Sequence, residues 1–194
     1  MKATRIAWLI LALVIAAPAA GETVGTFTLD SLSYISFGDD EILHLPAGST
    51  LRFRFGTTAA DGSTPFTIQP ADVAIGDVSV PSGGVLRYGM ASAASGTIRP
   101  TADGRRIDFT ATVRATLDRG ADSGSFDYAI PFTTEGAAAS DRPGTETLQV
   151  SGMRLVEGAW YGQIVGATTN KENAFPEPGA AVYTVLSGSF DQVP

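Results

Sequence analysis

The chain has 194 residues, with 13 Lys and Arg against 20 Asp and Glu, and its formal net charge is −7. This negative balance disfavours binding to nucleic acid or adsorption to an anionic lipid surface. The absence of cysteine excludes thiol catalysis, cysteine-ligated zinc, iron–sulfur clusters and a lipid anchor on a cysteine.

The N-terminal segment has the pattern of a secretory signal peptide. Lys2 and Arg5 precede an apolar run over residues 6–17, and Ala17-Pro18-Ala19 supplies the small residues of a peptidase site. The run is shorter than the roughly 20 residues of a membrane-spanning helix. We therefore expect residues 1–20 to be a helical signal, cleaved near Ala19 to Gly21. The mature chain is then secreted or periplasmic, without a stable membrane anchor. Without the two signal cations, 11 basic and 20 acidic residues remain, a net charge near −9.

Residues 21–194 are expected to form a single antiparallel β domain. Short segments with alternating apolar side chains are separated by turns rich in Gly, Pro and Asp, a pattern typical of half-buried strands. In chain order these segments are 23–29, 42–45, 51–56, 66–68, 86–90, 97–100, 104–118, 125–132, 148–155, 160–165 and 181–190. The alternation changes parity near Ser31 and again near Ser151-Gly152, and each change is interpreted as a β-bulge.

The clearest of these segments is 104–118, at the centre of a predicted three-strand meander over residues 95–132. Every second residue from Ile107 to Leu117 is apolar, and the residues between them are polar. This alternation is typical of a strand with one buried face and one solvent-exposed face. Asp103-Gly104 before it is typical of a tight turn with positive φ.

Two segments lack such alternation and are predicted to be loops. Residues 134–144 combine small and polar side chains and are expected to form a flexible surface loop. Residues 167–179 form a long irregular connection, and a loop of this length in a compact domain is frequently functional.

About ten short strands without a helix favour a β-sandwich or jelly roll. A closed barrel that carries a small apolar ligand is the alternative. In that case small inward residues such as Ala111 and Ala115 would leave a cavity.

No motif for catalysis is present, and neither catalytic residues nor a cofactor is predicted. His44 is the only histidine, and no Gly-x-Ser-x-Gly sequence accompanies it, so a serine–histidine triad has no support. Calcium is the one metal worth weighing. Two acidic turns could hold it, formed by Asp118, Asp122 and Asp127 and by Asp39-Asp40-Glu41, but neither has the EF-hand pattern. No metal site is therefore predicted.

A carbohydrate-active enzyme is a further alternative. It would need two carboxylates that face each other across a cleft near Trp160. The later part of the chain offers Glu146, Glu157, Glu172 and Glu177, and nothing in the sequence singles out a pair among them.

The predicted ligand site combines aromatic rings with amide and charged groups, which can stack on a sugar or hold a peptide. Its residues are Trp160, Tyr161, Asn170, Lys171, Glu172, Asn173 and Phe175. The competing interpretation places Trp160 in the core and leaves the loop as a plain connection.

Arginines on wet strand faces are the second surface feature. If the strands that carry Arg52, Arg54 and Arg114 are neighbours, these side chains make a basic stripe in an acidic protein. The sequence thus predicts an exported, non-catalytic binding or structural module whose partner is a glycan or a protein. The identity of the ligand and the oligomeric state stay open.

Overall fold

The computed structural model describes residues 23–38, 41–81, 83–120 and 123–194. This part of the chain is all-β and contains no α-helix; its one helical turn is the 3-10 turn η1 (Pro70–Asp72). The predicted signal, residues 1–20, lies outside the described residues.

Sixteen strands are assigned within the described residues. They are β1 (Thr23–Leu29), β2 (Tyr34–Phe37), β3 (Glu41–His44), β4 (Thr50–Phe55), β5 (Thr64–Ile68), β6 (Val73–Ala74), β7 (Val78–Ser79), β8 (Val85–Met90), β9 (Ala94–Pro100), β10 (Arg105–Asp118), β11 (Gly124–Thr133), β12 (Glu135–Ala139), β13 (Thr147–Ser151), β14 (Arg154–Val156), β15 (Ala159–Thr169) and β16 (Ala181–Phe190).

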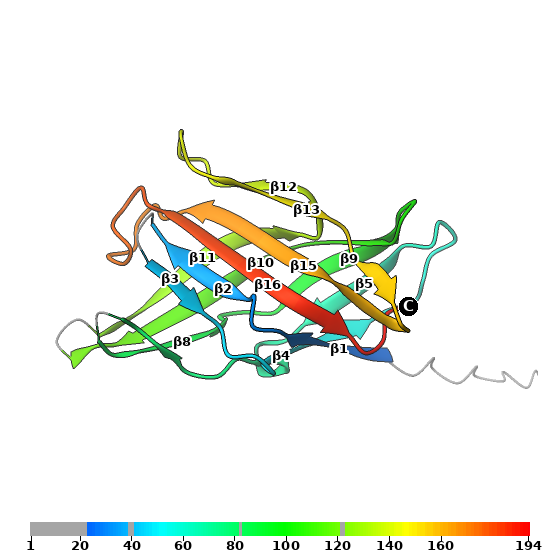
Figure 1. Ribbon diagram of the computed structural model, residues 1–194, viewed down its shortest axis with the longest axis horizontal. Coiled ribbons are helices and arrows are strands. Elements are labelled where there is room, and N and C mark those ends of the chain that lie inside the picture. The colour runs from blue at the N-terminus through cyan, green and yellow to red at the C-terminus, as the bar shows by residue number, and fades with distance from the viewer. Residues whose placement is uncertain (1–22, 39–40, 82, 121–122) are drawn as a thin grey trace, which may run out of the picture.

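Eight of the described strands close into an antiparallel barrel (Figure 1). The order is β15-β11-β10-β9-β5-β4-β1-β16, and the pairing of β16 with β15 completes the circle. The all-β antiparallel prediction is confirmed. The sandwich or jelly roll is not confirmed, because one continuous sheet closes on itself instead of two sheets packing face to face.

The predicted meander is confirmed as β9, β10 and β11. On β10 the residues from Ile107 to Leu117 alternate between buried and accessible, as the sequence pattern requires. The turn before β10 differs from expectation in one respect, since Gly104 has no positive φ. A Cβ at Gly104 would instead lie 1.9 Å from the backbone oxygen of Met153. Close approach of two backbones is therefore the reason for glycine here.

Two long strands of the barrel, β10 and β16, each pair with two different strands along their length, so additional strands join the sheet there. The first half of β10 pairs with β9 and its second half with β8. Likewise, β16 pairs with β2 over its first residues and with β1 over its last. The extra strands β2, β3, β7 and β8 extend the wall at this end.

Phenylalanines fill the interior of the barrel. The ring of Phe53 lies 4.9 Å from that of Phe66 and 4.8 Å from that of Phe190, and Phe109 stacks on Phe132 at 4.8 Å. The pocket lined by inward residues of β10, β8 and β16 measures only about 20 Å³, which is close to the room for one water molecule. Ala111 borders it, and Ala115 is fully buried.

The second, smaller sheet lies outside the barrel. β12 and β13 form a two-stranded hairpin, called the arm below, that packs on the outer face of β15 and β16 (Figure 1). Ala138 of the arm belongs to a cluster with Val165, Ala167, Tyr183 and Val185. The prediction of a loop over residues 134–144 is therefore wrong for residues 135–139, which form β12.

Neither change of parity is a bulge within one strand. Near Ser31 the chain leaves β1 and turns before β2, and Leu32 in that turn is 62% exposed. At Gly152, which has a φ of +88°, the chain leaves the arm and returns to the barrel, where Met153 is buried in the main core. Both parity changes therefore mark the ends of elements.

Candidate functional site

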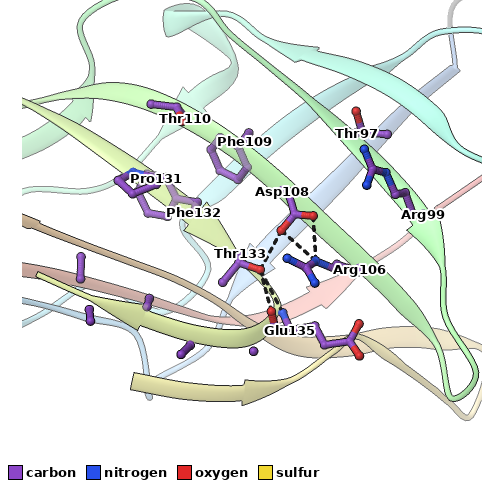
Figure 2. A pocket seen from close by; sticks show the side chains of 15 residues that line it. Thr97, Arg99, Arg106, Asp108, Phe109, Thr110, Pro131, Phe132, Thr133 and Glu135 are labelled. Carbon is purple, nitrogen blue, oxygen red and sulfur yellow. Dashed lines mark hydrogen bonds and ion pairs between the residues drawn. The ribbon is translucent and has the colours of Figure 1, made fainter. Parts of the chain in front are cut away.

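The largest hollow described lies between the arm and the barrel wall (Figure 2). This cleft, the arm groove, has a volume of about 590 Å³. Its floor is the outer face of β9, β10 and β11, and the edge of β12 forms one wall. The residues that line it are Thr97, Arg99, Arg106, Asp108, Phe109, Thr110, Pro131, Phe132, Thr133, Glu135, Gly136, Ala137, Ala138, Ala139 and Ala167.

The polar floor follows from the alternation of three paired strands. In the antiparallel register Arg99 lies opposite Arg106, Thr97 opposite Asp108, and Asp108 opposite Thr133. Residues directly opposite point to the same face of a sheet. Since Ile107 and Phe109 point into the barrel, their polar neighbours must point outward and line the groove.

A chain of hydrogen bonds crosses this floor toward the arm. The Arg106 Nε donates to both carboxylate oxygens of Asp108, at 3.0 and 2.8 Å. Asp108 also accepts from the Thr133 hydroxyl at 2.8 Å. The Thr133 Oγ1 atom in turn lies 2.9 Å from the carbonyl oxygen of Glu135 and accepts from the backbone nitrogen of Glu135 at 3.2 Å (Figure 2). The hydrogen bond to Asp108 raises the pKa of Arg106. The base of the arm is thus tied to the floor, and the charge of Asp108 is matched by Arg106.

Arg99 differs from its neighbour. Among the described residues it forms no ion pair, whereas Arg106 on the facing strand is paired with Asp108. Two guanidinium groups directly opposite each other repel. Arg99 is therefore the cation of the groove without a carboxylate at ion-pair distance; its charge acts instead on the exposed Asp61, whose pKa is lowered by hydrogen bonds from Ser63 and also by the charge of Arg99.

The structure separates the predicted site residues into two groups. Trp160 and Tyr161 lie at the start of β15, and Asn170 follows its end. Ten residues of extended strand place the two groups about 30 Å apart. Trp160 is half-buried against the main core, with the guanidinium carbon of Arg105 5.2 Å from its ring centroid, whereas Tyr161 is 48% exposed.

The predicted site residues in the loop mainly form hydrogen bonds that stabilise the conformation of the loop. Asn170 is buried, and its side chain donates to the carbonyl oxygens of Asn173 and Pro176. The Asn173 side chain donates to the Asp127 carbonyl at 2.9 Å.

Phe175 covers one end of the barrel interior. Its ring centroid lies 5.1 Å from that of Phe37 and 5.7 Å from that of Phe126, and its carbonyl accepts from the Tyr128 hydroxyl. Lys171 and Glu172 are exposed beside a small pocket of about 250 Å³. The predicted site residues thus do not all lie together, and Trp160 packs partly against the main core.

The arginine stripe is not formed. β5 and β9 lie between β4, which carries Arg52 and Arg54, and β10, which carries Arg114. Arg54 donates to Asp72 at 2.7 and 2.8 Å, and Arg114 donates to Asp127 at 2.7 Å through each of two nitrogens. The pair that sequence reasoning missed is Arg99 and Arg106, whose proximity depends on the register of β9 with β10.

The acidic turns are described only in part, because Asp39, Asp40 and Asp122 lie outside the described residues. The hydrogen bond from Arg114 lowers the pKa of Asp127. Within the described ranges no group of three or more His, Cys, Asp or Glu could hold a metal ion. His44 is exposed on β3 beside Tyr34.

Comparisons with known proteins add no relative: no family model, no curated protein and no solved structure matches the chain. In the part of the chain that the structure describes, no helix has the length and apolar character needed to cross a membrane.

Proposed function

We propose that the mature chain is an exported, non-catalytic binding module whose ligand lies in the arm groove, on the outside of the barrel. The observation that carries this proposal is the contrast between two volumes: about 590 Å³ in the groove against about 20 Å³ in the interior pocket. Ligand pockets usually measure roughly 300–1,000 Å³. A groove of this size, with a cation that has no carboxylate in contact, supports ligand binding outside the barrel.

The packing of the interior also weakens the alternative of a carrier for a small apolar ligand. Such a ligand would have to displace part of the phenylalanine core around Phe53, Phe66 and Phe109. Each of these side chains buries a large apolar area. The carrier alternative therefore requires an opening of the barrel, which makes it the second candidate.

The test is to map ligands by amide chemical shifts on the mature, isotope-labelled protein. A mixed set of short peptides and oligosaccharides is screened, and the expected hits shift the amides of Thr97, Thr110 and Ala137. Thr110→Trp places an indole on the groove floor and should abolish these shifts. Thr116→Trp is the matched control, because Thr116 points outward from the same strand and does not line the groove.

Two results would contradict the proposal. Shifts confined to interior positions such as Val113 and Leu186 would favour the apolar-ligand carrier. Binding that is equally strong in Thr110→Trp and the wild type would place the ligand elsewhere on the surface.

A further inference from the structure

The edge of β12 that faces the groove has no strand beside it. Among the described residues β12 pairs with β13 alone. Four consecutive residues, Gly136 to Ala139, line the groove. Because successive side chains of a strand point to opposite faces, a hollow that touches four residues in a row must run along the edge of the strand.

The hydrogen-bond pattern shows which backbone groups are free on that edge. The N–H of Gly152 donates to the carbonyl of Thr134 at 2.6 Å. In an antiparallel ladder the hydrogen-bonded pairs alternate, so Gly136 and Ala138 direct their N–H and C=O groups to β13. Glu135, Ala137 and Ala139 direct theirs to the groove. The groups of Glu135 contact the Thr133 hydroxyl, which leaves those of Ala137 and Ala139.

Natural edge strands are usually protected by a charge, a proline or a bulge against pairing with another chain. In β12 the charge of Glu135 and the positive φ of Gly136 (+97°) lie at the first two residues, so they do not cover Ala137 and Ala139, which are both exposed. Their free groups repeat at about 7 Å along the strand, which is the two-residue repeat of an extended peptide. An oligosaccharide has no such regular backbone of alternating donors and acceptors.

The floor of the arm groove adds a preference for a negatively charged group on the ligand. Arg99 lies on β9, one strand beyond the Arg106–Asp108 pair, and Glu135 lies at the start of the arm. Figure 2 shows Arg99 and Glu135 on opposite sides of this pair. A peptide strand beside β12 lies above β10 and β11, so a side chain directed to the floor has to cross about one strand spacing, roughly 5 Å, to meet Arg99. A carboxylate at that position would match the cation.

We infer that the arm groove binds an extended peptide, which adds as a strand to the free edge of β12 and places one carboxylate against Arg99. This inference rests on the proposed function and names its ligand class. The backbone hydrogen bonds at Ala137 and Ala139 supply affinity without regard to sequence, and Arg99 supplies the selection for a carboxylate. An edge of five residues accommodates a strand of about four to five residues.

The experiment measures fluorescence anisotropy with a labelled hexapeptide, Thr-Val-Glu-Val-Thr-Val, amidated at its C-terminus. A second peptide replaces Glu by Gln. A third also contains Gln but has a free C-terminal carboxylate, so the comparison separates a side-chain carboxylate from a terminal one. Amide shifts of Ala137 and Ala139 are recorded in parallel. We expect saturable binding of the Glu peptide, a downfield shift of both amide protons, and binding about tenfold weaker for the Gln peptide.

Proline variants test the edge. Ala137→Pro removes an N–H that points into the groove and should abolish binding of the Glu peptide. Gln149→Pro is the matched control, because Gln149 is the cross-strand partner of Ala137 and directs its own N–H to the other edge of the arm. Near-UV circular dichroism verifies the fold of both variants, and Ala139→Pro repeats the test if Ala137→Pro unfolds. Binding that survives both Ala137→Pro and Ala139→Pro would overturn the inference.

Arginine variants test the carboxylate. Arg99→Gln should weaken the Glu peptide about tenfold and leave the Gln peptide unchanged, whereas Arg154→Gln, on exposed β14 outside the groove, should change neither. Equal affinities of all three peptides for the wild type would also overturn the inference. A peptide-independent doubling of the mass in sedimentation, abolished by Ala137→Pro, would assign the edge to a second copy of the chain instead.

The two proposals fail in distinguishable ways. If an oligosaccharide shifts the groove amides while none of the three peptides binds, the groove is a binding site and the peptide inference is wrong. If neither class shifts any groove amide, both proposals are wrong.

Discussion

The barrel interior and the layer beneath the arm are two hydrophobic cores of very different construction. The interior is made of interlocking phenylalanines from several strands, including Phe27, Phe53, Phe66 and Phe190. The layer under the arm contains mostly alanine and valine, with Tyr183 as the one aromatic residue among its buried members.

The two cores therefore differ in how strongly they stabilise the strands that pack on them. A two-stranded hairpin is marginal by itself, and the arm depends on a small apolar contact and on the hydrogen bond from the Tyr183 hydroxyl to the Glu146 carbonyl at 2.9 Å. The floor of the arm groove thus belongs to the rigid barrel, and its wall belongs to the less stable element. Such elements open at lower free energy than the core does.

Removal of a central ring should give the largest effect. Phe53 is fully buried and contacts Phe55, Phe66, Phe109 and Phe190. Phe53→Ala is expected to lower the free energy of unfolding by about 3–5 kcal/mol, measured by urea denaturation. Tyr161→Ala, at an exposed position, serves as the control with little change. A loss below about 1 kcal/mol for Phe53→Ala would mean that the interior is not the stabilising core.

Overpacking tests whether the interior is filled. Ala115 is fully buried on the inner face of β10, so Ala115→Leu should destabilise by about 1–3 kcal/mol in the same denaturation experiment. Ala129→Leu, on the outward face of β11, should be nearly neutral. Stabilisation by Ala115→Leu would reveal a cavity and revive the carrier of an apolar ligand.

A half-buried ion pair between Arg54 on β4 and Asp72 in η1 gives a pH-dependent effect. Asp72 is buried and accepts from Arg54 and from the N–H of Gln69 at 3.1 Å. The hydrogen bond from Arg54 holds the pKa of Asp72 below its ordinary value of 3.8. Because the folded state holds the proton less readily than the unfolded chain, this contribution is complete above about pH 5 and disappears as the pH falls through the lowered pKa.

Asp72→Asn should therefore cost about 1–2 kcal/mol at pH 7 and much less near pH 2, measured by urea denaturation at both pH values. Asp77→Asn is the control, because Asp77 is exposed and lies 3.5 Å from Arg87, an arrangement worth about 0–1 kcal/mol. A difference between Asp72→Asn and the wild type that does not depend on pH would exclude the charged pair as its cause.

The smallest global effect is expected in the arm. Leu148 is half-buried against the layer under the arm, and Leu148→Ala should lower the global free energy of unfolding by only about 1 kcal/mol. Hydrogen exchange at Gly136 and Ala138, whose amides bond to β13, should nevertheless accelerate while exchange on β10 does not. Gln149→Ala, on the exposed face of β13, should leave both rates unchanged. Equal acceleration on β10 would show that arm and barrel open as one unit.

Much of the fold could be predicted from the local alternation of apolar and polar residues in the sequence. The inward and outward residues of β10 follow from its sequence, because a strand with one dry face places every second side chain in the core. The arm lacks this signal: Gly136, Ala137 and Ala138 are too similar to show a polar and an apolar face, so the segment resembles a loop. Its strand character depends on pairing with β13 and on Val165 and Tyr183, which lie much later in the chain.

The candidate site was harder to predict than the fold. Aromatic and amide residues near Trp160 and Asn170 are close in sequence, yet a straight strand separates them by its whole length. The arm groove takes its residues from β9, β10, β11, β12 and β15. Its only sequence signal is a pair of arginines, Arg99 and Arg106, whose facing positions depend on one hairpin register.

The sequence by itself determined the all-β class, the meander of β9 to β11 and the inward and outward faces of the strands with clear alternation, such as β4 and β10, because these depend on local alternation and turn residues. Only the tertiary structure decided that the sheet closes, that the arm lies on the outside and that Arg99 and the free edge of Ala137 face one groove. Closure and docking are contacts between residues far apart in the chain, and no local pattern specifies which distant edge a strand will meet.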